Sequence, residues 1–274
     1  MKKILFIVAA FASLAASAQI KEDKNVFNHL SVGAGVGTTG INIEVGTTVL
    51  PFITMRAGLD ITPKFSYGTD IEVDKPDDWF NLAPIVRKAY LPNEDPNSSV
   101  EKVDLEGSLK MVNGKLLFDI YTGKNSLFHF TVGAYFGNKK QISMKARGDI
   151  LAALESYNQD VDNGIPGVGT EKFLVEGYEL GVNKGRARFD VTTSGFKPYL
   201  GFGVGRSVPR KRVGCKFEMG AMLWGKPKLY DYYKGEYLNK ETPGLSADFQ
   251  DGIDIGEKVK AYPVLKFTIM GRIF

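Results

Sequence analysis

Apolar and polar residues alternate along much of this chain. In the first such stretch Leu30, Val32, Ala34 and Val36 share one parity, while Ser31 and three glycines occupy the other. Successive side chains of a strand point to opposite faces, so this period of two predicts a strand with one apolar and one polar face. The alternation recurs in segments of about ten residues, which predicts an antiparallel all-β protein.

The apolar parity is rich in aromatic side chains. The clearest segment sets Phe128, Phe130 and Phe136 on one face and His129 and Thr131 on the other. A soluble sandwich also shows alternation, but so aromatic a face suits contact with lipid. We therefore predict a transmembrane, up-and-down antiparallel β-barrel with long loops.

The strand number follows from counting these segments. They are 30–37, 41–49, 53–61, 103–120, 128–136, 187–191, 200–204, 213–223 and 262–274. Asn113-Gly114 is either a hairpin turn, which adds a strand, or a bulge. A barrel of this class has an even number of strands. We predict eight, for example with residues 30–49 as one strand, and ten as the alternative.

Long intervals separate some segments, namely residues 63–101, 146–184 and 226–257. The second interval predicts one short helix, with Asp149 as its cap and Asn163-Gly164 as its end. Its apolar face consists of Ile150, Leu151, Leu154 and Tyr157. We expect this helix to pack over a barrel mouth or to lie on the membrane surface.

The N-terminal residues predict export. Lys2 and Lys3 precede an apolar stretch over residues 4–14, and Ala16-Ser17-Ala18 supplies small residues before Gln19. We expect a signal peptide over residues 1–18, cleaved between Ala18 and Gln19, a periplasmic segment over 19–28 and the barrel over 29–274. After the signal no run approaches the ~20 apolar residues of a membrane-spanning helix.

The charge and the cysteine content limit the classes of partner and the sources of stability that we expect. The formal charge of +4 includes Lys2 and Lys3, and the longest basic block is Arg210-Lys211-Arg212, so we do not expect a nucleic acid partner. Cys215 is the only cysteine, which makes an intrachain disulfide impossible. Stability is therefore expected to come from the sheet.

Several glycine-rich and aromatic motifs occur in a characteristic order, at residues 35–41, 55–58, 128–133, 197–203 and 262–274. Together they resemble the small outer-membrane β-barrel superfamily, the OmpA-type and OmpW-type barrels, and in particular barrels of Bacteroidota-type envelopes. The resemblance implies a monomer in the outer membrane of a Gram-negative bacterium, in contact with outer-membrane lipid and lipopolysaccharide and inserted by the barrel-assembly machinery. Members of this superfamily differ in function.

The last segment is the candidate assembly strand of such a barrel, with Phe267, Ile269, Ile273 and Phe274 as its apolar residues. The usual signal has apolar residues at alternate positions back from the final aromatic residue. Here Phe274 has the opposite parity to the apolar row, so the match requires a bulge near Gly271.

Charged residues on the lumenal parity are balanced in sign. The set comprises Glu44, Arg56, Asp60, Asp104, Glu106, Lys110, Asp119, Arg186, Arg188, Asp190, Lys216 and Glu218, with Lys266 and Arg272 beside them. Unpaired buried charge is costly, so a matched set favours a narrow interior plugged by ion pairs. A selective pore is expected to show an excess of one sign instead.

Two motifs have the spacing of a cofactor site and of a metal site, but the residues around them do not fit such a site. Residues 35–40 match G-x-G-x-x-G, but the following residues continue as strand instead of opening a helix. Asp160, Asp162 and Glu171 have calcium-loop spacing, yet Ile165 stands where glycine is required. We predict no cofactor and no metal site. A loose calcium contact through acidic residues 70–78 stays open beside a solvated surface.

Only two histidines are present, which restricts hydrolytic chemistry. His29 and Ser31 lie two residues apart on one strand face, which resembles the His-x-Ser element of outer-membrane lipid A deacylases. These two are the candidate catalytic residues. The favoured interpretation is instead an interfacial His29 and a hydrogen-bonding His129 in the lumen, with no catalytic residue.

The favoured function is a structural or ligand-binding role through the outer loops, with an unknown extracellular ligand. Tyrosines at 230–237 fit either a membrane-interface girdle or such a binding surface. The first alternative is a small, porin-like diffusion pore for solutes. The second is a lipid A or phospholipid acyl hydrolase.

Overall fold

The computed structural model describes residues 27, 29–75, 77–93, 95, 97–123, 125–166, 168–175, 177–239 and 241–274. The predicted signal peptide and the cleavage site at Ala18 and Gln19 lie outside these residues, as does nearly all of the predicted periplasmic segment. Within the described ranges, no helix has the length and apolar character needed to cross a membrane.

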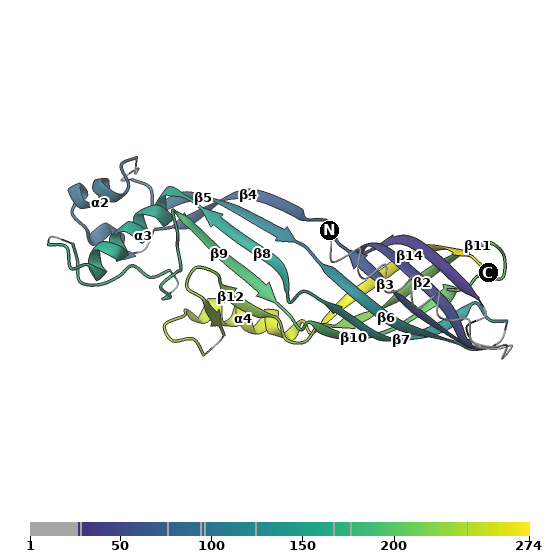
Figure 1. The fold of residues 1–274 in the computed structure, drawn as a ribbon. Coiled ribbons are helices and arrows are strands. Elements are labelled where there is room, and N and C mark those ends of the chain that lie inside the picture. The colour runs from purple at the N-terminus through teal and green to yellow at the C-terminus, as the bar shows by residue number, and fades with distance from the viewer. Residues whose placement is uncertain are drawn as a thin grey trace.

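Eight antiparallel strands close into a barrel (Figure 1). They are β1 (Leu30–Gly37), β2 (Gly40–Leu50), β3 (Ile53–Ile61), β6 (Val112–Tyr121), β7 (Phe128–Gly137), β10 (Phe196–Gly205), β11 (Val213–Leu223) and β14 (Ala261–Arg272). Each barrel strand pairs with the next barrel strand along the chain, and β14 closes the circle against β1. The predicted fold class and the count of eight are confirmed.

A second, open sheet continues the barrel wall beyond one end (Figure 1). Its strands are β4 (Phe65–Asp74), β5 (Val100–Leu109), β8 (Lys140–Arg147), β9 (Arg186–Thr192), β12 (Lys228–Asp231) and β13 (Glu236–Leu238). Only a few residues separate β4, β5, β8, β9 and β12 from β3, β6, β7, β10 and β11, respectively. We call this sheet with its helices the extension. Above β1 and β2, which a tight turn joins, the wall does not continue.

The helices of the extension cover the apolar face of its sheet. They are η1 (Asp77–Asn81), α2 (Pro84–Tyr90), α3 (Asp149–Asp162) and α4 (Ala247–Lys258). At the end far from the barrel, α3 packs with Trp79 and Phe173 over Val103 and Ala187 (Figure 1). Ile253 of α4 belongs to a second cluster, over β9, β12 and β13. Each cluster buries side chains that a sheet in water would otherwise expose.

The predicted helix is confirmed, with a different cap and a different location. Gly148, in extended conformation, precedes the helix, and Asp149 is its first residue. The predicted apolar face is buried. It packs against α2, β5 and β9 at the far end of the extension, so it does not cover the barrel mouth.

Two predicted strand boundaries are wrong. Asn113 and Gly114 pair in regular register with β3 and β7, so they form neither a hairpin turn nor a bulge. The break comes at Lys110 and Met111, where the chain passes from the extension into the barrel. Residues 30–49 form two strands, with Gly40 at φ +92° where the chain turns back.

Candidate functional site: the barrel interior

The predicted parity holds in the barrel strands. Side chains of one parity are mostly apolar and point outward. Those of the other parity point inward and are mostly polar, charged or glycine, with a few buried apolar residues such as Leu117 and Met222. Gly203 shows why glycine is frequent inside: a Cβ at this position would lie 2.9 Å from the ring of His129. Small residues on some strands therefore leave room for long side chains from the others.

Arg56 of β3 lies at the centre of the interior and is fully buried. Its guanidinium donates to Glu44 at 3.0 Å, to Asp119 at 2.7 Å and to Glu218 at 2.5 Å. These carboxylates come from β2, β6 and β11, so one side chain joins opposite sides of the barrel wall. The planar guanidinium has five donors, which suits contact with several carboxylates at once.

Three buried lysines complete this arrangement. Lys115 lies 2.8 Å from Glu44 and 2.7 Å from Asp60. Lys216 lies 2.7 Å from Glu44, and Lys266 lies 3.5 Å from Glu218. We call these contacts the interior network; it comprises Glu44, Arg56, Asp60, Lys115, Asp119, Lys216, Glu218 and Lys266. Its acids and bases are equal in number, which limits the desolvation cost of burying them.

A turn and an aromatic layer lie at the two ends of this network. Ser207, in the turn between β10 and β11, is buried and donates to Asp119, while its own N–H donates to the Tyr121 hydroxyl at 3.0 Å. Toward the extension, Tyr135 and Tyr199 pack edge to face at 5.4 Å between ring centroids. They form a buried cluster with Leu117, Met222 and Val264.

Half of the predicted lumenal residues lie outside the barrel. Asp104 and Glu106 are on β5, and Arg186, Arg188 and Asp190 are on β9, all in the extension. Lys110 lies between β5 and β6. The error has a physical cause: a strand that leaves the barrel keeps its alternation, so parity alone does not show where the closed wall ends.

Two further lysines, Lys115 and Lys197, face inward but were absent from the predicted set. Lys115 shares the parity of Asp119 and could have been found by it. Lys197 donates to Asn113 at 2.8 Å. Arg272, by contrast, lies at the end of β14 and contacts His29 Nδ1 at 3.1 Å.

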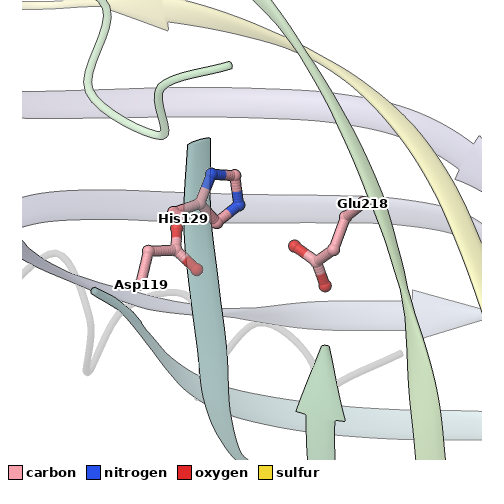
Figure 2. Close-up of side chains that lie close together, drawn as sticks. All are labelled: Asp119, His129 and Glu218. Atoms are coloured by element: carbon pink, nitrogen blue, oxygen red, sulfur yellow. The ribbon is translucent and has the colours of Figure 1, made fainter. Parts of the chain in front are cut away.

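Asp119, His129 and Glu218 form a group of potential metal ligands (Figure 2). One ligand atom from each lies within 4.8 Å of the others. Nδ1 of His129 is 3.3 Å from the Leu127 carbonyl oxygen, and Nε2 has no hydrogen-bond partner. Arg56, however, donates to both carboxylates. A cation would have to displace this guanidinium, so the group is organised around Arg56 and not around a metal.

The candidate hydrolytic pair is not arranged for proton transfer. Ser31 is fully buried, and its hydroxyl donates to the carbonyl oxygens of Ser207 at 2.6 Å and of Gly46 at 3.2 Å. His29 instead contacts Arg272. A nucleophile and its base need a direct hydrogen bond, and the proton of this hydroxyl is directed elsewhere.

The last strand lacks the bulge that a match to the usual assembly signal would require. Phe267 and Ile269 point outward, and the pairing of β14 with β1 continues in register through Gly271 to Arg272. Ile273 and Phe274 follow the strand and are exposed. A backbone oxygen of Phe274 accepts a hydrogen bond from the N–H of Leu30 at 3.1 Å.

No family model matches this chain, and no curated protein matches it significantly. The solved structures that are similar include CarO2 and CarO of Acinetobacter baumannii, each at 16% identity. The CarO2 comparison covers 91% of this chain and all of that chain, with a TM-score of 0.43. The CarO comparison covers 90% and 99%, with a TM-score of 0.44. Likeness at this level does not establish a function. The fold is assigned as a barrel from the strand pairing of this chain.

Proposed function

We propose that this chain is an outer-membrane β-barrel protein that anchors a closed barrel in the bilayer and holds the extension in water to bind a ligand at the cell surface. The carrying observation is that the same eight strands combine an apolar, exposed outer surface with a packed, charge-paired interior. This combination suits a barrel in lipid that does not conduct.

The outer surface supports the membrane location. Its exposed apolar side chains come from every part of the barrel wall, and they include Val36, Ile43, Phe130, Phe202, Phe217 and Phe267. The barrel strands have 8 to 12 residues, and ~9–11 residues span a bilayer when tilted. A continuous apolar belt of this kind is far larger than the patches that soluble monomers expose.

The distribution of connections supports the orientation. Residues 51–52, 122–127 and 206–212 link barrel strands at the end where β1 begins and β14 ends. All the long connections lie at the other end and form the extension. Small outer-membrane barrels have short periplasmic turns and long outer loops. The extension, including residues 226–257, is therefore assigned to the extracellular side.

The pore and hydrolase alternatives have less support. Ion pairs across the interior, the Ser207 turn and the Tyr135–Tyr199 layer all fill space that a solute path would need. Hydrolysis would need Ser31 to leave two carbonyl partners and turn toward His29. Insertion by the barrel-assembly machinery, contact with lipopolysaccharide, a monomeric state and the kinship with OmpA-type and OmpW-type barrels belong to the same proposal.

The test is conductance of the refolded chain in planar bilayers, with folding verified by heat-modifiable gel mobility. We expect no steady conductance, and a known diffusion porin in the same bilayers controls the recording. Steady conductance from the folded protein would establish the pore instead. Fatty acid release from phospholipid vesicles, with Ser31→Ala as the matched variant, tests the hydrolase, and release that this substitution abolishes would establish it.

A further inference from the structure

The charged face of the extension carries a ladder of basic side chains. On β8 and β9, Lys145 lies opposite Arg188, and Arg147 lies opposite Arg186. The members of each strand differ by two positions, so all four share one face. Like charges directly opposite each other destabilise a sheet. On the β5 side Lys145 and Arg147 lie opposite Glu106 and Asp104, but on the β9 side two like-charged pairs follow each other.

The outer pair of this ladder, Arg147 and Arg186, forms no ion pair within the described residues, although Asp104 lies opposite Arg147 on β5. Lys145 lies 3.6 Å from Glu106, and Arg188 lies 3.1 Å from Asp190. Arg147 and Arg186 are both exposed, and neither forms an ion pair with any residue of the described ranges. The two guanidiniums are therefore available to an anion.

Exposed tyrosines adjoin the ladder on the same face. Tyr230 of β12 lies opposite Asp190, and Tyr237 of β13 lies opposite Tyr230, with 4.9 Å between ring centroids. The Arg188 guanidinium lies 3.9 Å from the ring centroid of Tyr232. Tyr237 is 58% exposed and Tyr232 is 47% exposed. The basic ladder thus runs into an aromatic surface that water reaches.

We propose that this face binds an anionic oligosaccharide. Arg147 and Arg186 would bind its carboxylate, sulfate or phosphate groups, because guanidinium forms bidentate, charge-assisted hydrogen bonds with such groups. The tyrosine rings would pack against the sugar rings, since they offer rigid, amphipathic contact area at low entropic cost. This inference rests on the proposed function, because it requires the extension to face the cell exterior.

Charge distribution favours a carbohydrate over single-stranded nucleic acid, which also uses basic and aromatic side chains. A nucleic acid carries a charge at every nucleotide and needs a continuous positive groove. Here the same face carries Asp70, Asp104, Glu106 and Asp190 near the ladder. A ligand with spaced anionic groups can reach the arginines without lying along these carboxylates.

The test uses the whole refolded chain in detergent and isothermal titration with a heparin-derived hexasaccharide and with trigalacturonate. We expect the chain to bind at least one of these two saccharides. The affinity should fall tenfold or more in Arg147→Gln/Arg186→Gln. It should fall about threefold in Tyr237→Ala, since a single ring contributes modestly to binding. The matched control, Lys211→Gln/Lys258→Gln, removes the same charge elsewhere and is expected to bind like wild type. Neutral dextran and single-stranded DNA are titrated in parallel.

Absence of binding to both anionic saccharides would overturn the inference, as would equal affinity for dextran or an unaffected double arginine variant. Tighter binding of single-stranded DNA at the arginines would replace the carbohydrate with nucleic acid. These outcomes are separate from those of the conductance test. A closed barrel that binds no saccharide refutes only this inference, and a conducting chain that binds one refutes only the closed barrel.

Discussion

The barrel and the extension are built from the same continuous stretches of chain, yet they place charge in opposite situations. In the barrel, charged side chains face a closed interior in which Arg56 and its partners are fully buried. In the extension, charged side chains of β5, β8 and β9 lie on an open side of the sheet. Asp190 is buried there by its contacts with Lys140 and Arg188, but Arg147 is exposed and has no ion-pair partner among the described residues. The apolar side is exposed around the barrel but covered by α3 and α4 in the extension.

This difference shows that closure of the sheet determines what a polar face must do. A charge inside a closed wall loses its water and requires partners, because an unpaired buried charge costs several kcal/mol. A charge on an open sheet keeps its water and can remain available to a ligand. The apolar faces differ for a related reason: the face of the extension is buried by helices, whereas the proposed partner of the barrel surface is lipid.

The largest expected effect comes from removing the central cation of the barrel. Arg56→Met leaves Glu44, Asp119 and Glu218 buried with less compensating charge, so we expect a loss of about 3–5 kcal/mol in the free energy of unfolding of the barrel. The chain has two tryptophans, and Trp224 lies where β11 leaves the barrel. Urea unfolding followed by Trp224 fluorescence in a Trp79→Phe background measures the effect.

The matched control for Arg56→Met is a substitution of a cation that forms an exposed ion pair in the extension. Lys64 lies 3.2 Å from Glu106, and both side chains are largely in water. Surface pairs of this kind contribute little to stability, so Lys64→Met is expected to leave the unfolding midpoint unchanged. Equal shifts for the two substitutions would refute the contrast between a closed and an open charged face.

The next effect concerns the extension alone. Trp79 is fully buried against Phe173, with 5.4 Å between ring centroids, in the cluster that holds α3 to the sheet. Trp79→Ala is expected to cost about 3–5 kcal/mol of local stability, since large buried aromatic side chains leave cavities when truncated. Hydrogen exchange of the α3 amides should rise sharply, while Trp224 reports unchanged unfolding of the barrel.

Ile85→Ala serves as the control, because Ile85 of α2 is 81% exposed and its truncation leaves no cavity. Loss of barrel stability on Trp79→Ala would mean that the two regions unfold as one unit. The barrel and the extension would then form one cooperative structure rather than two separable regions.

Sequence patterns predicted the parts of this molecule that depend on neighbouring residues. Alternation predicted the outward and inward faces of the barrel strands, and helical spacing predicted α3 with its buried face. The exit of β5 and β9 from the barrel could not be predicted, because the alternation of Asp104, Glu106, Arg186 and Arg188 is the same in either sheet. β4, exposed along almost its whole length, showed too little apolar content to be recognised.

The smallest effect is a pH dependence confined to the extension. The Tyr90 hydroxyl donates to Asp160 at 2.7 Å, and burial together with this hydrogen bond raises the pKa of Tyr90 to about 12. The pKa of tyrosine in an unfolded chain is about 10. The neutral hydroxyl therefore stabilises the contact between α2 and α3 fully below pH ~10, and this contribution is lost as the pH rises through about 12. Tyr90→Phe should cost about 1 kcal/mol or less at neutral pH. Trp79 fluorescence in a Trp224→Phe background measures the unfolding of the extension with and without Tyr90→Phe. The difference in stability between the two proteins should shrink as the pH rises through that interval. A difference independent of pH would show that the hydroxyl does not stabilise the helices.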